Sequence, residues 1–276
     1  MKKRAVTPPE QKTGRSDRTT DHPHGTDEVL CGFHSVHEAL KAGKREFAEL
    51  MVQKDKMGHR HEQVASLAQS RKIPVRPVGV ELLDRLAQGA RHQGVILKSK
   101  GIPLVPASRA MAQFGKDSTP CFILILENIE DPHNLGALIR TAQCAGVSSI
   151  FIPKDRSCHP TPSVSRSSAG AMEHADIFVM TNTASFIKEI KQHGFWVGGL
   201  DAAGENPLHQ TDMTGRFALV VGSEHKGIRP LVRKQCDYLI SIPMLGKVNS
   251  LNASVAGAVA MYEGLRQREI TTPGAQ

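Results

Sequence analysis

Residues 121–142 read CFILILENIEDPHNLGALIRTA, and this stretch decides the class of fold. Its first six residues are an apolar run that indicates a buried strand. A polar segment follows at residues 130–134, and a helical pattern then begins, in which Arg140 lies six residues beyond Asn134. A buried strand that leads into a helix is the repeating unit of parallel α/β sheets.

The same unit repeats downstream. Five more apolar runs are typical of buried strands: SIFIP at 149–153, DIFVM at 176–180, FWVGGL at 195–200, FALVVG at 217–222 and YLISIP at 238–243. Helical patterns separate most of them, and a last helix is expected from about Leu251 to Arg268. The pattern predicts a parallel sheet with helices on both faces.

Residues 28–100 predict a second, smaller α/β unit. Strands are expected at FAELMVQ (47–53), IPVRPV (73–78) and GVILKS (94–99), and helices at HEQVASLAQSRK (61–72) and GVELLDRLAQG (79–89). The expected domains are a disordered basic tail at 1–27, this unit at 28–100, a linker at 101–119, the larger unit at 120–268 and a tail at 269–276.

Composition narrows the class of protein. The net charge is +8, and residues 28–100 hold 13 Lys and Arg against 8 Asp and Glu, so polyanion binding is expected mainly there. Five scattered cysteines without a C-x-x-C pair argue against disulfides and a zinc site, and no metal is expected. No apolar run approaches the roughly 20 residues that span a bilayer. We therefore expect a cytoplasmic protein without a membrane partner.

Polar residues follow three of the expected strands. After the opening stretch come VVGSEHKGI (220–228) and IPMLGKVNSLNASVAGAVAMYEGL (242–265). Because parallel strands end at one edge of a sheet, three polar strand ends predict a site there. A dinucleotide site is not supported, since no G-x-G-x-x-G follows the first strand, and GSEHKGIR lacks the Lys and Ser/Thr of a P-loop.

These stretches also carry a family resemblance. NLGALIR (134–140), GSEHKG (222–227) and IPMLGKVNSLNASVA (242–256) are similar, in order and separation, to the three motifs of the SpoU/TrmH family of RNA 2′-O-ribose methyltransferases. Residues 28–100 resemble the small RNA-binding domain fused to many members. The resemblance implies a deep trefoil knot, S-adenosylmethionine as cofactor, RNA as substrate and a homodimer.

The resemblance also implies roles for individual residues. The cofactor pocket is expected to be lined by Gly222, Ile242 and Leu251. The catalytic side is expected to comprise Arg140, Asn134, Glu224, Ser250 and Asn252. Asn134 is also a candidate cap for the helix that follows it.

Two roles remain open for Arg140. In this family an arginine at this position is often cast as the general base, but a guanidinium keeps its proton in proteins. A role that fits the chemistry better is to grip the phosphate beside the target ribose and stabilise the developing alkoxide. Large-subunit ribosomal RNA, with guanosine as the target, is the favoured substrate. The alternatives are tRNA, a base nitrogen as methyl acceptor, and a non-catalytic RNA-binding protein that kept the fold.

Overall fold

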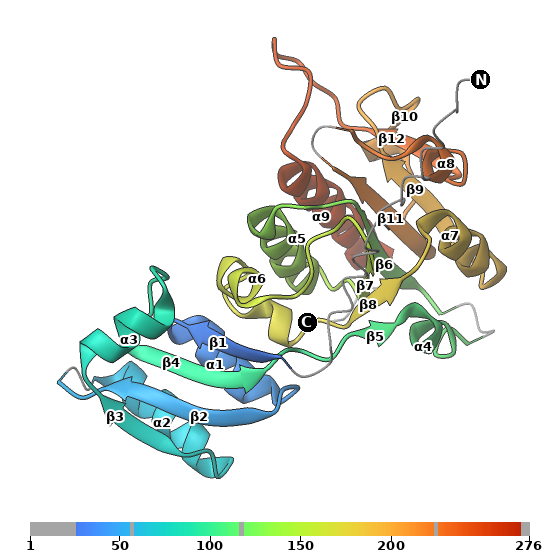
Figure 1. The fold of residues 1–276 in the computed structure, drawn as a ribbon. Coiled ribbons are helices and arrows are strands. Elements are labelled where there is room, and N and C mark those ends of the chain that lie inside the picture. Colours follow the sequence, from blue (N-terminus) through green and yellow to red (C-terminus); the bar gives the residue numbers. More distant parts are fainter. Residues whose placement is uncertain (1–25, 56–57, 116–118, 224–225, 272–276) are drawn as a thin grey trace, which may run out of the picture.

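The computed structural model describes residues 26–55, 58–115, 119–223 and 226–271, which form two sheets flanked by helices (Figure 1). Nearly all of the expected tail at 1–27 lies outside these ranges, and Asp27 already begins a strand. At the other end, the last helix continues to Thr271, three residues into the expected tail at 269–276.

The larger sheet has eight strands, and every strand pair in it is parallel. In spatial order the strands are β10 (Asn206–Pro207), β12 (Tyr238–Ser241), β9 (Trp196–Leu200), β11 (Arg216–Gly222), β6 (Cys121–Glu127), β7 (Ser149–Pro153), β8 (Ile177–Met180) and β5 (Val105–Pro106). The expected parallel sheet is confirmed, and its six long strands coincide with the six apolar runs. The two-residue edge strands were not expected from the sequence.

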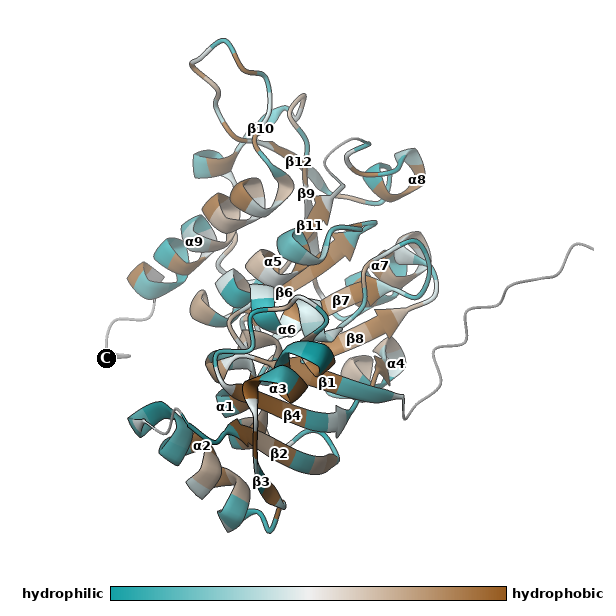
Figure 2. Ribbon diagram, turned by 60° about the vertical axis from the view of Figure 1, so that its left-hand side comes forward, coloured by the Kyte–Doolittle hydropathy of each residue, from teal (hydrophilic) through white to brown (hydrophobic). Residues whose placement is uncertain are grey.

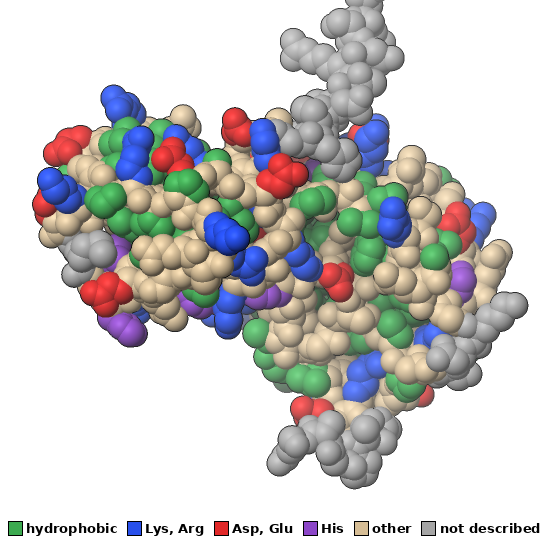
Figure 3. All heavy atoms as spheres, turned by 90° about the horizontal axis from the view of Figure 1, so that it is seen from below, with side chains coloured by type: hydrophobic (Ala, Val, Ile, Leu, Met, Phe, Trp, Pro, Cys, Tyr) green, Lys and Arg blue, Asp and Glu red, His purple; other side chains and the backbone are tan. Residues whose placement is uncertain are grey.

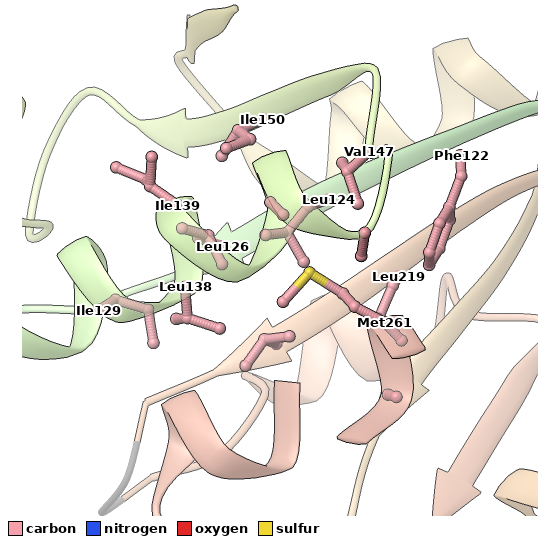
Figure 4. Packing of buried hydrophobic residues seen from close by; sticks show 14 of the residues in the cluster. Phe122, Leu124, Leu126, Ile129, Leu138, Ile139, Val147, Ile150, Leu219 and Met261 are labelled. Carbon is pink, nitrogen blue, oxygen red and sulfur yellow. The ribbon is translucent and has the colours of Figure 1, made fainter. Parts of the chain in front are cut away.

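Alternation along β6 explains why both faces of this sheet are covered. Leu124 and Leu126 belong to one hydrophobic cluster, and Ile123 and Ile125 belong to another, because successive side chains of a strand point to opposite faces. The first cluster includes residues of α5 (Pro132–Cys144), α6 (Pro162–Ser167) and α9 (Ala253–Thr271). The second includes residues of α4 (Ala107–Met111), α7 (Thr183–Gln192) and α8 (Pro230–Arg233). Figure 4 shows the first cluster, with Met261 of α9 directed toward β6 and β11.

The smaller sheet is mixed. Its strands, in spatial order, are β1 (Asp27–Cys31), β4 (Val95–Lys100), β2 (Phe47–Gln53) and β3 (Val75–Val78). Only β2 and β3 run parallel, and β4 is antiparallel to both of its neighbours. Residues of α1 (Phe33–Ala42) and α2 (His59–Ser70) share a cluster on one face, and α3 (Val80–Ala87) packs on the other. In Figure 2 the strands of both sheets are largely hydrophobic (brown), whereas the helices that cover them carry both hydrophobic and hydrophilic residues.

Residues 101–119, expected as a linker, hold part of the larger sheet. Val105 and Pro106 form β5, which pairs with β8, and α4 follows at once. Two short 3₁₀ helices, η1 (Ala171–Glu173) and η2 (Leu208–Gln210), complete the elements. In the described ranges every helix is too short or too polar to cross a membrane. The trefoil knot that the resemblance implies stays a prediction.

Candidate active site

The site lies where the chain changes direction within the larger sheet. From β6 the chain proceeds to β7 and β8 on one side, whereas β11, β9 and β12 lie on the other. β6 and β11 are parallel neighbours, and Glu127 pairs with Gly222 at their carboxyl ends. In open parallel sheets this switch point forms a crevice in which ligands bind.

The opening stretch leaves β6 through a capped helix start. The side chain of Asp131 accepts a hydrogen bond from the His133 amide at 3.0 Å, and Pro132 occupies the first turn of α5, where its missing N–H costs nothing. Asp131 is therefore the cap, and the interpretation of Asn134 as the cap was wrong. Asn134 lies inside the first turn of α5, two residues after Pro132.

A side-chain contact joins the first and third motifs. The side-chain amide of Asn252 donates to Oδ1 of Asn134 at 3.1 Å, across 118 residues of sequence. Oδ1 of Asn252 in turn accepts from the amide of Ser254 at 2.9 Å and that of Val255 at 3.3 Å, so Asn252 caps α9. Asn134 is 8% exposed and Asn252 is exposed, so the bridge joins a buried residue of α5 to the surface at the start of α9.

Arg140 lies apart from this bridge. It is exposed on α5, and six residues of helix place its side chain about 120° away from that of Asn134 around the helix axis. The described residues that line the neighbouring cavity do not include Arg140. The structure thus brings Asn134 and Asn252 together and leaves the guanidinium at the surface, where a large polyanion has access to it.

A cavity of about 740 Å³ adjoins the bridge, within the range of roughly 300–1,000 Å³ typical of small-molecule sites. Segments after β9, β11 and β12 line it, and among the lining residues are Gly222, Ile242, Ser250 and Leu251. All three residues expected to bind the cofactor therefore face one hollow. Glu224, the remaining predicted residue, lies outside the described residues.

Gly222 is required by close packing. A Cβ at this position would lie 2.3 Å from the carbonyl carbon of Gly227, so a side chain would force the loop after β11 outward. Ser223 and Gly227 exchange backbone hydrogen bonds of 3.2 and 2.8 Å, which hold these two residues together at the end of β11. The wall of the cavity is thus backbone on one side and the apolar side chains of Ile242 and Leu251 on the other.

Sequence reasoning missed a buried carboxylate beside the cavity. Glu127 is fully buried at the end of β6, accepts a hydrogen bond from Thr183 Oγ1 at 2.6 Å and forms an ion pair with Arg229. Arg229 follows the loop that walls the cavity, so this pair anchors the loop to the sheet. A carboxylate that closes a wholly apolar strand was the available signal, because burial of a charge requires a partner.

Thiol chemistry does not suit this site. Burial raises the pKa of Cys236 to about 12 and that of Cys158 to about 11, so both thiols stay protonated at neutral pH. A protonated thiol is a weak nucleophile. The polar side chains that line the cavity are hydroxyls, an amide, cations and the carboxylate of Asp201, which suit the binding of a polar ligand.

Two family models match the chain. The one described as SpoU rRNA Methylase family matches residues 121–262, and the one described as RNA 2′-O ribose methyltransferase substrate binding matches residues 29–103. The 23S rRNA (guanosine-2′-O-)-methyltransferase RlmB of Bordetella pertussis is 38% identical over 248 residues, which cover 88% of this chain and 98% of that protein.

Solved structures share the fold over most of the chain. One described as an RNA 2′-O ribose methyltransferase has a TM-score of 0.72 at 25% identity and covers 88% of this chain and 89% of its own. AviRb from Streptomyces viridochromogenes, a SpoU methyltransferase solved in complex with AdoMet, has a TM-score of 0.72 at 21% identity, with 88% and 90% covered. The second likeness concerns the fold.

Proposed function

The chain belongs to the SpoU rRNA methylase family, and we propose that it methylates the ribose 2′-hydroxyl of a guanosine in large-subunit ribosomal RNA. The observation that carries the proposal is the meeting of the three motifs at one edge of the sheet. Asn134 of the first touches Asn252 of the third, and Gly222 of the second lines the adjoining cavity.

The cavity fits S-adenosylmethionine, which supplies an activated methyl group when bound. Gly222 and Gly227 present bare backbone at one wall, which suits hydrogen bonding to a nucleoside, and Ile242 and Leu251 supply apolar surface. Ser250 stands on the same rim. Asn134 and Asn252 would orient the acceptor ribose, because each side-chain amide offers both a donor and an acceptor.

We assign to Arg140 the binding of the phosphate next to the target ribose. Its exposure on α5 suits contact with RNA, and its planar fork matches two phosphate oxygens. The same positive charge would stabilise the alkoxide as the 2′-hydroxyl loses its proton to water or phosphate. Arg140→Ala should abolish methyl transfer and leave cofactor affinity, measured by calorimetry, within a few fold of wild type. Near-wild-type turnover would refute this role.

RNA binding is assigned chiefly to residues 28–100, which we treat as a domain separate from the catalytic residues 120–268. A hollow of about 780 Å³ in the smaller unit is lined in part by Arg60, Arg91 and Phe33, and the Arg60 guanidinium lies 5.3 Å from the Phe33 ring centre. Cations beside an aromatic face bind unpaired nucleotides. Arg91→Ala should weaken RNA binding, whereas Arg76→Ala, on the β3 edge, should not. Equal effects of the two changes would mean that the hollow is not the RNA site.

A homodimer is the proposed assembly. Val255, Val259 and Tyr262 lie 42–50% exposed along one side of α9, at spacings of four and three residues. Leu251, at 38% exposed, belongs both to this apolar stripe and to the cavity rim. A second copy on the stripe would therefore cover both. Val259→Glu should give a monomer in analytical ultracentrifugation, and an unchanged dimer would place the interface elsewhere.

The experiment that tests the whole proposal is a map of 2′-O-methyl groups in ribosomal and transfer RNA. Cells with and without this protein would be compared, and loss of one guanosine methyl from large-subunit RNA is the expected result. Loss of a tRNA methyl would favour the tRNA alternative. No loss, together with no binding of S-adenosylmethionine, would favour a non-catalytic assembly factor. The proposed location is the cytoplasm, where the protein would act in ribosomal RNA processing.

A further inference from the structure

A buried ion pair joins the smaller unit to the catalytic unit. Nε and Nη2 of Arg45 donate to the two carboxylate oxygens of Glu173 at 2.7 and 3.0 Å, and both side chains are at most 1% exposed. Arg45 also donates to Glu28 at 2.7 Å, and Glu173 accepts from Ser165 Oγ at 2.9 Å. Each charge is thus held within its own unit as well as across the boundary.

The boundary around this pair is closely packed. A Cβ on Gly170 would lie 2.6 Å from Cβ of Glu38, which leaves no space between η1 and α1. Glu38 accepts from His174 at 2.7 Å, and Lys44 pairs with Asp176 at 2.9 Å at the solvent edge. Figure 3 shows the two units in contact, with acidic and basic side chains interspersed over the visible face.

On the catalytic side of this boundary, α6 packs directly against α5, the helix that carries the site. Ser167, at the end of α6, donates to the Pro132 carbonyl at 2.8 Å, and a Cβ on Gly136 would lie 2.0 Å from its hydroxyl. α5, which bears Asn134 and Arg140, therefore has α6 against one side. Through Glu173, Arg45 therefore binds the segment that packs against α5.

An ion pair at this boundary, where apolar contacts would suffice, indicates a role beyond stability. Apolar residues of similar volume often hold a buried boundary as firmly as an ion pair, so stability alone does not explain two buried charges. A bidentate guanidinium–carboxylate pair does add a geometric requirement, since the two planes must stay aligned. We propose that Arg45 and Glu173 are positioning residues that fix the orientation of the RNA-binding unit relative to Arg140. The proposal rests on the RNA methylation proposed above.

The test compares variants at two neighbouring contacts of one boundary. Glu173→Gln keeps the shape and the hydrogen bond from Ser165 but removes the charge, and Arg45→Met/Glu173→Met replaces the pair by apolar surface. Lys44→Ala is the matched control, because Lys44 and Asp176 are 38% and 64% exposed. The measurements are kcat and KM on ribosomal RNA, the dissociation constant for S-adenosylmethionine, and the small-angle scattering profile.

Loss of orientation should lower kcat, because a misplacement of about 1 Å costs up to roughly 100-fold. We expect kcat to fall about 10- to 100-fold in Glu173→Gln and in the double variant, with KM for RNA and cofactor affinity within about threefold. Lys44→Ala should stay within twofold. A merely structural pair would lower thermal stability and leave kcat of the folded enzyme unchanged, and that result in both variants would overturn the inference.

Two further outcomes are decisive. If the double variant does not fold, Glu173→Gln and the conservative Arg45→Lys decide, and wild-type kcat in both would count against the proposal. If the wild-type protein methylates no ribosomal RNA, the proposed function fails separately. Small-angle scattering then tests the orientation independently of activity. Identical profiles for wild type and Glu173→Gln would show that the pair does not fix the orientation of the two units.

Discussion

The bridge between Asn134 and Asn252 can be separated from the helix cap that Asn252 also forms. Asn252→Ala removes both, whereas Asn252→Asp keeps the oxygen that accepts from the Ser254 and Val255 amides and loses the donor to Asn134. Aspartate caps helices as well as asparagine does. The aspartate variant therefore isolates the bridge.

The structure sets the size of each effect. Loss of the cap costs about 0.5–2 kcal/mol, and loss of a hydrogen bond costs about 0.5–1.5 kcal/mol. We expect Asn252→Ala to lose about 1–3.5 kcal/mol of unfolding free energy. Each kcal/mol lowers the Tm by about 2–4 °C in a unit of this size. Asn252→Asp should lose less stability, since only the bridge is broken.

Catalytic activity should depend on the bridge to Asn134 rather than on the cap of α9. In Asn252→Asp a carboxylate oxygen faces the carbonyl of Asn134, so both side chains must shift, and kcat should fall about 10- to 100-fold. Ser254→Ala is the control, since it removes only a hydroxyl that donates to Asn252 at 2.6 Å and leaves the bridge intact. Thermal melts and methylation of ribosomal RNA measure both effects. Wild-type kcat in Asn252→Asp would refute a catalytic role for the bridge.

Three further predictions address charge and protonation. Arg140→Lys should lose about 2–4 kcal/mol of transition-state stabilisation and add no ionisation to the pH–rate profile; a rate that climbs toward the lysine pKa of about 10.4 would restore Arg140 as the base. At pH 8, an alkylating reagent should modify the exposed Cys144 well before Cys236, whose pKa burial raises to about 12; equal rates detected by mass spectrometry would contradict that burial. A hydrogen bond from Arg266 lowers the pKa of Glu263 to about 2. The stabilising effect of the Glu263 carboxylate should therefore be present above pH 4.5 and disappear as the pH falls toward 2. The Tm difference between wild type and Glu263→Gln should shrink over that range, and a constant difference would refute this prediction.

Much of the fold could be predicted because strands and helices leave local patterns. Each long strand of the larger sheet is an apolar run of four to seven residues, and the alternation of those runs with helical periods is enough to predict a parallel sheet. The two-residue strands β5 and β10 had no such pattern. They exist only because a neighbouring strand offers its edge, which is a property of the assembled sheet.

The chemistry of the site could be predicted only as far as its motifs. The resemblance identified Asn134, Arg140 and Asn252 as site residues, but their spacing in the sequence does not say which of them are in contact. The helix geometry of α5 places Arg140 on a different side from Asn134. The strand order places β11, which ends in the second motif, beside β6, and the start of α9 brings Asn252 of the third motif to Asn134. The wrong prediction of Asn134 as the cap of α5 has a local cause instead, because the helix begins at Pro132 and Asp131 occupies the position directly before it.

Buried charges were the least predictable feature from the sequence by itself. Lysines, arginines and carboxylates are mostly solvated, so a sequence that contains Arg45, Glu127 and Glu173 favours the surface for each. Burial becomes possible only when a partner from a distant segment satisfies the charge, as Arg229 does for Glu127 and Arg45 does for Glu173. The sequence determined which elements form and where the polar strand ends lie. The tertiary structure decided which charges could leave water, because the partner that permits burial lies about 100 or more residues away along the chain.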